Sequence, residues 1–156
     1  MPYRVLFVGV GSPHGDDRIG WLVADELMQL ADCEARVVSS PAIRKASSPA
    51  DLLDWLEGVF DRLVVCDACS AEGSPGTCTR WIWPEPSVRR ALPAGTHQLS
   101  LVDALDLASS LQRLPNEVIL WGVQAESVEP QPELSVSVAA ALPDLVQRIR
   151  GDLLHA

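Results

Sequence analysis

Three side chains capable of chemistry follow apolar runs of the sequence. Asp17 lies in "VGVGSPHGDDRIG", Asp67 in "VVCDAC" and His97 in "GTHQLSLVDALDLA". Two carboxylates that lie close together repel each other, so such a site must hold a proton, a cation or hydrogen-bond donors. Two carboxylates with an imidazole suit a borderline divalent metal such as nickel or zinc better than calcium. The alternative chemistry is an acid/base pair that acts on water.

The glycines around Asp17 resemble a nucleotide-binding turn but do not complete one. Gly9, Gly11 and Gly15 are followed by two acids, which would compete with a phosphate for the free N–H groups of the next helix. The acid expected at the end of the second strand is also missing. A nucleotide-binding domain therefore remains only an alternative. We expect Asp16 to cap that helix and shape the turn, and Gly9 and Gly11 to let the backbone pass close to a bound substrate.

The elements that must position these residues alternate between strands and helices. Strands are predicted over 3–10, 34–40, 62–69, 76–86 and 116–124, and helices over 17–30, 49–59, 95–111 and 133–150. This order predicts a single α/β domain over 1–156, with a twisted, mostly parallel five-stranded sheet between helices on both faces. The period-2 pattern of 76–86 indicates one antiparallel edge strand. The polar, proline-bearing segment 39–51 is predicted to be a mobile surface segment.

The predicted topology brings the candidate residues together. Ligands of open parallel sheets bind at the carboxyl ends of the strands. The first and third strands are neighbours in the usual doubly wound order, about 4.8 Å apart. We therefore expect Asp17 and Asp67 to meet in one crevice, with His97, at the mouth of the following helix, facing the same place.

Composition narrows the class of partner. The 156 residues carry a formal net charge of −9, which disfavours nucleic acid and anionic membranes as partners. No apolar stretch approaches the roughly 18 residues of a membrane span, and the N-terminal run is typical of a first strand and not of a secretion signal. We expect a cytoplasmic monomer whose cysteines are reduced, with Cys66 as a buried thiol and Cys69 as a packing residue. His14 is expected to be a solvated loop histidine.

Four stretches together resemble the hydrogenase maturation endopeptidases, which remove the C-terminal extension of the [NiFe] hydrogenase large subunit. The opening "VGVGSPHGDDRIG" is similar to that family's glycine turn and acidic pair, and "VVCDAC" to its second acid. "GTHQLSLVDALDLA" resembles its histidine motif, and "LWGVQAESVEP" its strand that runs into an acidic, proline-containing loop. Their order and spacing agree over nearly the whole chain.

The resemblance implies a substrate and a recognition mechanism. It implies that Asp17, Asp67 and His97 engage nickel already installed in the large-subunit precursor, so that the metal is supplied by the substrate and no cofactor is bound permanently. The water that hydrolyses the peptide could then be activated by a carboxylate or by the nickel.

Two stretches depart from the family pattern. The Asp-Gly-Gly-Thr-like stretch expected after the second strand is replaced, over 38–43, by "VSSPAI", and "SPHG" stands where asparagine is common. The first departure supports an alternative function, a noncatalytic nickel-dependent checkpoint or chaperone that holds the precursor without cutting it.

Overall fold

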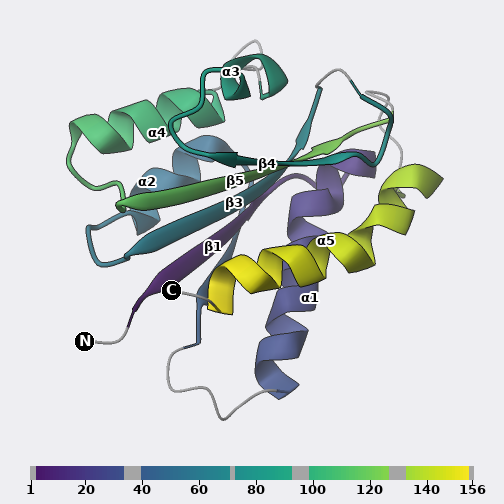
Figure 1. The fold of residues 1–156 in the computed structure, drawn as a ribbon, viewed down its shortest axis with the longest axis horizontal. Coiled ribbons are helices and arrows are strands. Elements are labelled where there is room, and N and C mark those ends of the chain that lie inside the picture. Colours follow the sequence, from purple (N-terminus) through teal and green to yellow (C-terminus); the bar gives the residue numbers. More distant parts are fainter. Residues whose placement is uncertain (1–2, 34–39, 71–72, 93–98, 127–132, 155–156) are drawn as a thin grey trace.

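A computed structural model describes residues 3–33, 40–70, 73–92, 99–126 and 133–154 (Figure 1). Within these residues the chain forms one five-stranded sheet in the order β2-β1-β3-β5-β4. The strands are β1 (Val5–Val10), β2 (Ala42–Ala46), β3 (Arg62–Cys69), β4 (Cys78–Ile82) and β5 (Glu117–Gln124). The helices are α1 (Ile19–Cys33), α2 (Leu52–Trp55), α3 (Val88–Ala91), α4 (Leu101–Ser110) and α5 (Val136–Leu154), with 3-10 turns η1 (Gly15–Arg18) and η2 (Pro49–Asp51).

The strand pairing confirms the predicted sheet. β1 pairs in parallel with both β2 and β3, and β3 pairs in parallel with β5. β4 closes one edge by pairing antiparallel with β5. The carboxyl ends of β1 and β3 therefore lie side by side, as the prediction for Asp17 and Asp67 requires.

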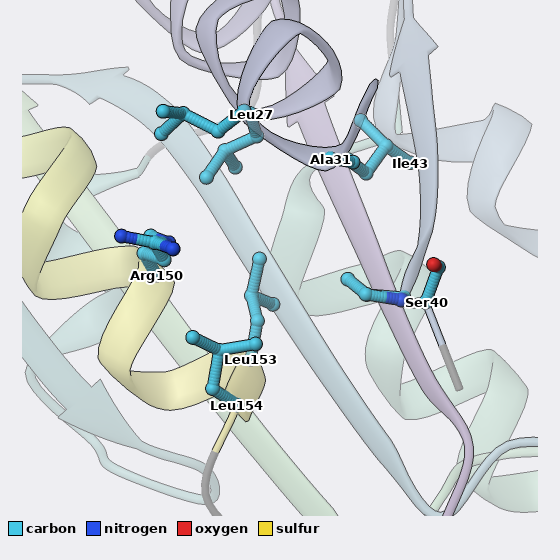
Figure 2. Close-up of a pocket in the computed structure, with 9 residues that line it drawn as sticks. Leu27, Ala31, Ser40, Ile43, Arg150, Leu153 and Leu154 are labelled. Carbon is cyan, nitrogen blue, oxygen red and sulfur yellow. The ribbon is translucent and has the colours of Figure 1, made fainter. Parts of the chain in front are cut away.

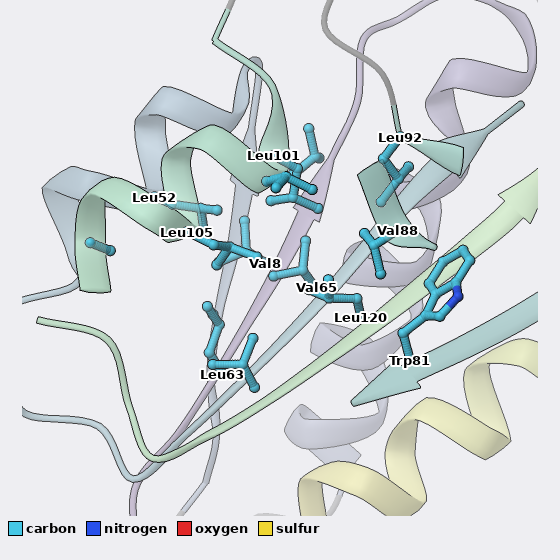
Figure 3. Packing of buried hydrophobic residues seen from close by; sticks show 14 of the residues in the cluster. Val8, Leu52, Leu63, Val65, Trp81, Val88, Leu92, Leu101, Leu105 and Leu120 are labelled. Carbon is cyan, nitrogen blue, oxygen red and sulfur yellow. The ribbon is translucent and has the colours of Figure 1, made fainter. Parts of the chain in front are cut away.

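Helices cover both faces of the sheet, with α2, α3 and α4 on one side and α1 and α5 on the other (Figure 1). Successive side chains of a strand point to opposite faces. Leu6, Val65 and Leu120 accordingly pack in the first cluster, where Figure 3 shows Val65 and Leu120 near Leu101 and Leu105. The second cluster contains Phe7, Val64 and Trp121, packed with α1 and α5 residues. The central strands are apolar at nearly every position because both of their faces are buried.

The second strand differs from the sequence prediction. It spans Ala42–Ala46, inside the segment predicted to be mobile surface, whereas most of the strand predicted over 34–40 lies outside the described residues. Its polarity concealed it: β2 is an edge strand, and the side chains of Arg44 and Lys45 are exposed. The departure from the family pattern that was predicted over 38–43 lies partly outside the described residues and stays a prediction.

The remaining helices follow the predictions with shifted ends. The helix predicted over 95–111 is α4, which begins at Leu101; the oxygen of its N-cap Ser100 accepts a hydrogen bond from the Asp103 N–H. The helix predicted over 49–59 ends at Trp55, and α3 was not predicted. In the described part of the chain, no helix is long and apolar enough to cross a membrane.

Candidate active site

A pocket of about 230 Å³ opens at the carboxyl ends of β1 and β3. Its walls come from the turn after β1, the end of β3, the segment after β2, and the α3 and α4 ends that face the sheet. They are formed by Val10, Gly11, Asp17, Ser47, Pro49, Asp67, Ala68, Cys69, Ser70, Ala91, Leu92, Leu99, Ser100 and Leu101. The pocket thus occupies the edge of the sheet at which parallel α/β folds bind their ligands.

Asp17 and Asp67 both line this pocket. Asp17 lies in η1 and is exposed, whereas Asp67, near the end of β3, is half-buried. Burial raises the pKa of the Asp67 carboxyl well above its usual value, and the charge of Asp17 raises it further, against a smaller lowering effect of the Ala68 N–H. The structure therefore brings the two predicted carboxylates into one site, where their charges oppose each other.

His97 lies outside the described residues, so its predicted place in the site stays a prediction. Leu92 and Leu99, the described residues on either side of it in sequence, both line the pocket. Among the residues that the structure describes, no three histidine, cysteine or acidic side chains are grouped closely enough to hold a metal ion. A complete metal site would need a third ligand beyond Asp17 and Asp67.

Asp16 has a different role from the one predicted. Its side chain is buried, with 6% exposed, and its carboxylate accepts hydrogen bonds from the Glu126 N–H (2.8 Å), the Ser135 N–H (2.8 Å) and the Ser135 hydroxyl (3.0 Å). The N-cap residue of η1 is His14, which makes no side-chain capping bond. Asp16 therefore ties η1 to the residue directly before α5 and does not cap the helix that follows it in sequence.

The glycines serve the packing of α1. A Cβ on Gly9 would lie 2.0 Å from the carbonyl oxygen of Gly20, and one on Gly20 would lie 2.3 Å from that of Val10. A Cβ on Gly11 would lie 2.4 Å from the Asp17 carbonyl oxygen. The predicted role of Gly9 beside a substrate is thus wrong, because its open side is filled by α1. Gly11 does line the pocket, but its lack of a side chain is needed for the η1 turn.

The fourth side of the pocket is the start of α4. Ser100 and Leu101 line it, so the first turn of α4, which Ser100 caps, lies at the pocket wall. Ser100 is buried, with 6% exposed. The start of α4 therefore forms part of the wall of the pocket that contains the two carboxylates.

The cysteines and His14 agree with their predictions. Cys66 is a buried free thiol and Cys69 is buried, and burial raises the pKa of Cys66 well above its ordinary value. A buried thiol of raised pKa is a poor nucleophile and a poor metal ligand. His14 is exposed in the turn before η1.

A second, smaller pocket of about 30 Å³ lies between α1, β2 and α5 (Figure 2). It is lined mainly by aliphatic side chains, among them Leu27, Ile43 and Leu153, together with Arg150. The residues that line it carry no carboxylate, imidazole or thiol.

The fold and the acidic pocket together define a class that comparison with known proteins identifies. The family model of the hydrogenase maturation proteases (HycI) matches residues 46–152. The chain belongs to this family, and it is accordingly an endopeptidase that processes the C-terminus of a hydrogenase large subunit. The match favours the protease over the nucleotide-binding and noncatalytic alternatives.

Solved structures of similar proteins agree with this assignment. The hydrogenase maturating endopeptidase HybD from E. coli is 25% identical, with a TM-score of 0.77 over 96% of this chain and 91% of that one. The hydrogenase 2 maturation peptidase from Thaumarchaeota archaeon SCGC_AB-539-E09 is 27% identical, with a TM-score of 0.62 over 97% and 98%. The [NiFe] hydrogenase maturation protease HycI from Thermococcus kodakarensis KOD1, at 21% identity, shares the fold with a TM-score of 0.71 over 97% and 93%. No curated protein sequence matches the chain.

Proposed function

We propose that this endopeptidase reads nickel in the active site of a [NiFe] hydrogenase large-subunit precursor, through Asp17, Asp67 and His97, and cuts only the nickel-loaded form. The observation that carries the proposal is the pair of carboxylates in one pocket, with the charge of Asp17 contributing to the raised pKa of Asp67. The nickel is part of the substrate and is not a resident cofactor of the enzyme.

The chemistry of the pocket fits a divalent cation. Two like charges in a half-buried site oppose each other, and a cation between them converts that repulsion into attraction. Carboxylate oxygens alone would suit calcium or magnesium. The imidazole of His97 would shift the preference toward nickel or zinc. Two or three protein ligands leave coordination positions for the ligands that the precursor keeps.

The connectivity around His97 supports its place as the third ligand. Leu99, two residues after His97, lines the pocket and is 38% exposed. Ser100 follows it as the N-cap of α4. The segment that carries His97 is thus joined in sequence to residues of the pocket wall.

The rest of the pocket suits a peptide. Its wall combines aliphatic side chains such as Leu92 and Leu99 with the hydroxyls of Ser47 and Ser70. Ser47 and Pro49 belong to segment 39–51, and we infer that this segment forms part of the peptide groove. An extended chain gains apolar contacts and hydrogen-bond partners along such a wall. Hydrolysis then uses a water that is activated by a carboxylate or by the substrate's nickel.

The remaining properties of the enzyme follow the same proposal. We place it in the cytoplasm, since the described cysteines Cys66 and Cys78 are reduced thiols. We expect a monomer, since the exposed large hydrophobic side chains among the described residues are all aliphatic and none is aromatic.

Binding measurements separate the nickel mark from peptide recognition. The affinity of the enzyme is measured by calorimetry for a large-subunit precursor with and without nickel. We expect the nickel-loaded form to bind at least tenfold more tightly, and the preference to vanish in Asp17→Asn and Asp67→Asn. Asp25→Asn, which removes a carboxylate on α1 that is paired with Lys45, is the matched control and keeps the preference. Equal affinity of the wild-type enzyme for both forms would refute the proposal.

A further inference from the structure

Asp16 and Asp17 are consecutive in the η1 turn but lie in different surroundings. Asp17 is exposed and lines the pocket, whereas Asp16 is buried and bonded to residues at the ends of the segment between β5 and α5. Through Asp16, the turn after the first strand is tied to the segment after the last one.

We propose that Asp16 is a positioning residue for the processing reaction: it anchors η1 to Glu126 and Ser135 and so holds the adjacent Asp17 in the pocket beside Asp67. The inference rests on the proposed role of Asp17 in engaging the substrate. Asp16 itself does not line the pocket and is not a catalytic residue.

The pocket gives a physical reason for such an anchor. Two like charges repel, and η1 is a single 3-10 turn with few hydrogen bonds of its own. An unanchored turn would let Asp17 move away from Asp67, because the two charges repel each other. The glycine contacts hold the backbone of η1 against β1 at one side, since the carbonyl of Asp17 leaves no room for a side chain on Gly11. Asp16 supplies the hold on the other side.

The bonds of Asp16 are strong enough for this role. All three hydrogen bonds are donated to the Asp16 carboxylate, and charge-assisted hydrogen bonds are about twice as strong as neutral ones. Two of them come from Ser135, directly before α5, where the partial positive charge of the helix start favours a carboxylate. The helix that follows Ser135 is itself held on the sheet, because Val138, Leu145 and Ile149 of α5 are buried in the second cluster.

The test compares two variants that weaken the anchor. Asp16→Asn replaces one carboxylate oxygen by an NH₂ group, which cannot accept the hydrogen bonds that Glu126 and Ser135 donate. Ser135→Ala removes only the bond from the Ser135 hydroxyl. We expect kcat/KM for a nickel-loaded precursor to fall roughly 100-fold in Asp16→Asn, the loss that a misplaced reacting group brings, and roughly tenfold in Ser135→Ala. Ser135→Thr keeps a hydroxyl and is expected to restore most of the activity.

A matched control separates positioning from stability. Asp152 also accepts three hydrogen bonds, from Arg80 and Trp121, but does not line the pocket. Asp152→Asn should lower the urea midpoint of unfolding and leave kcat unchanged. If kcat of Asp152→Asn falls as far as that of Asp16→Asn at equal stability, the loss is structural and the inference is overturned.

A double-mutant cycle distinguishes this inference from the proposed function. If Asp16 acts only through Asp17, Asp16→Asn causes no further loss of affinity for the nickel-loaded precursor in the Asp17→Asn background. Full activity of Asp17→Asn would show that the proposed site is wrong. An inactive Asp17→Asn together with fully active Asp16→Asn and Ser135→Ala would leave the site intact and overturn the positioning role alone.

Discussion

Asp17 and Asp67 share a pocket at the ends of two neighbouring parallel strands, and the charge of Asp17 helps to raise the pKa of Asp67. This opposition of charges costs folding stability in the free protein. Active sites commonly keep such strain because the groups are arranged for the bound state. The repulsion between Asp17 and Asp67 predicts measurable changes in stability when either charge is removed.

Removing the charge of Asp17 should stabilise the free protein while it abolishes processing. We expect Asp17→Asn to raise the free energy of unfolding at neutral pH by about 1 kcal/mol, typical of a relieved active-site conflict. Asp25→Asn, which breaks a surface ion pair with Lys45, should change it by less than about 0.5 kcal/mol. Urea denaturation of the three proteins measures both values. A destabilised Asp17→Asn would show that the two carboxylates do not conflict.

The conflict also predicts a pH dependence of stability. The folded-state pKa of Asp67 lies well above the ordinary value of 3.8, so between 3.8 and this raised pKa the folded protein keeps a proton that the unfolded chain has lost. The stability from this proton is fully present below 3.8 and is lost as the pH rises through the folded-state pKa. Asp67→Asn should therefore be more stable than the wild type at neutral pH.

Unfolding curves at several pH values test whether the pKa of Asp67 is raised in the folded protein. The advantage of Asp67→Asn over the wild type should shrink as the pH falls and should disappear near 3.8. Since all other ionisable groups are shared, their contributions cancel in the difference. An advantage that grows toward acid pH would mean that the pKa of Asp67 is lowered and not raised.

The close contact between α1 and the sheet predicts a strong effect at Gly20. A Cβ there would lie 2.3 Å from the Val10 carbonyl oxygen and 2.7 Å from that of Cys66. Neither backbone can move without disturbing the sheet, so Gly20→Ala should cost about 3 kcal/mol, the upper range of overpacking. The matched control is Gly151 in α5, where a Cβ meets nothing within 4 Å.

At Gly151 an alanine is expected to have the opposite effect on stability. Alanine is favoured over glycine inside a helix, so Gly151→Ala should stabilise the protein by about 0.5–1 kcal/mol. Thermal and urea unfolding compare the two variants with the wild type. Similar effects at Gly20 and Gly151 would show that α1 can move away from β1 without cost.

The sequence predicts the central sheet well and the edge poorly. The apolar runs of β1, β3 and β5 mark strands with two buried faces, and the alternation in β4 marks an edge. β2 carries exposed Arg44 and Lys45, so nothing in its composition distinguishes it from a loop. Only its pairing with β1 makes it a strand, and pairing between distant segments has no local signal.

The site residues also divide into those whose place the sequence predicts and those whose place it does not. Asp17 and Asp67 could be placed together because both follow apolar runs, and the order of neighbouring parallel strands is a general rule. The partners of Asp16 could not, since Ser135 is 119 positions away and its hydroxyl gives no indication of a buried partner. The role of Gly9 was also hidden, because the atom that excludes a side chain there belongs to Gly20 on α1.

The most direct test of the account is intact-mass spectrometry of a nickel-loaded large-subunit precursor after incubation with catalytic amounts of this protein. A nickel-free precursor and the His97→Ala variant are run in parallel. The account predicts a single C-terminal loss of mass, seen only when nickel is present and His97 is intact. Cleavage of the nickel-free precursor, or full cleavage by His97→Ala, would contradict the claim that the enzyme reads nickel through Asp17, Asp67 and His97.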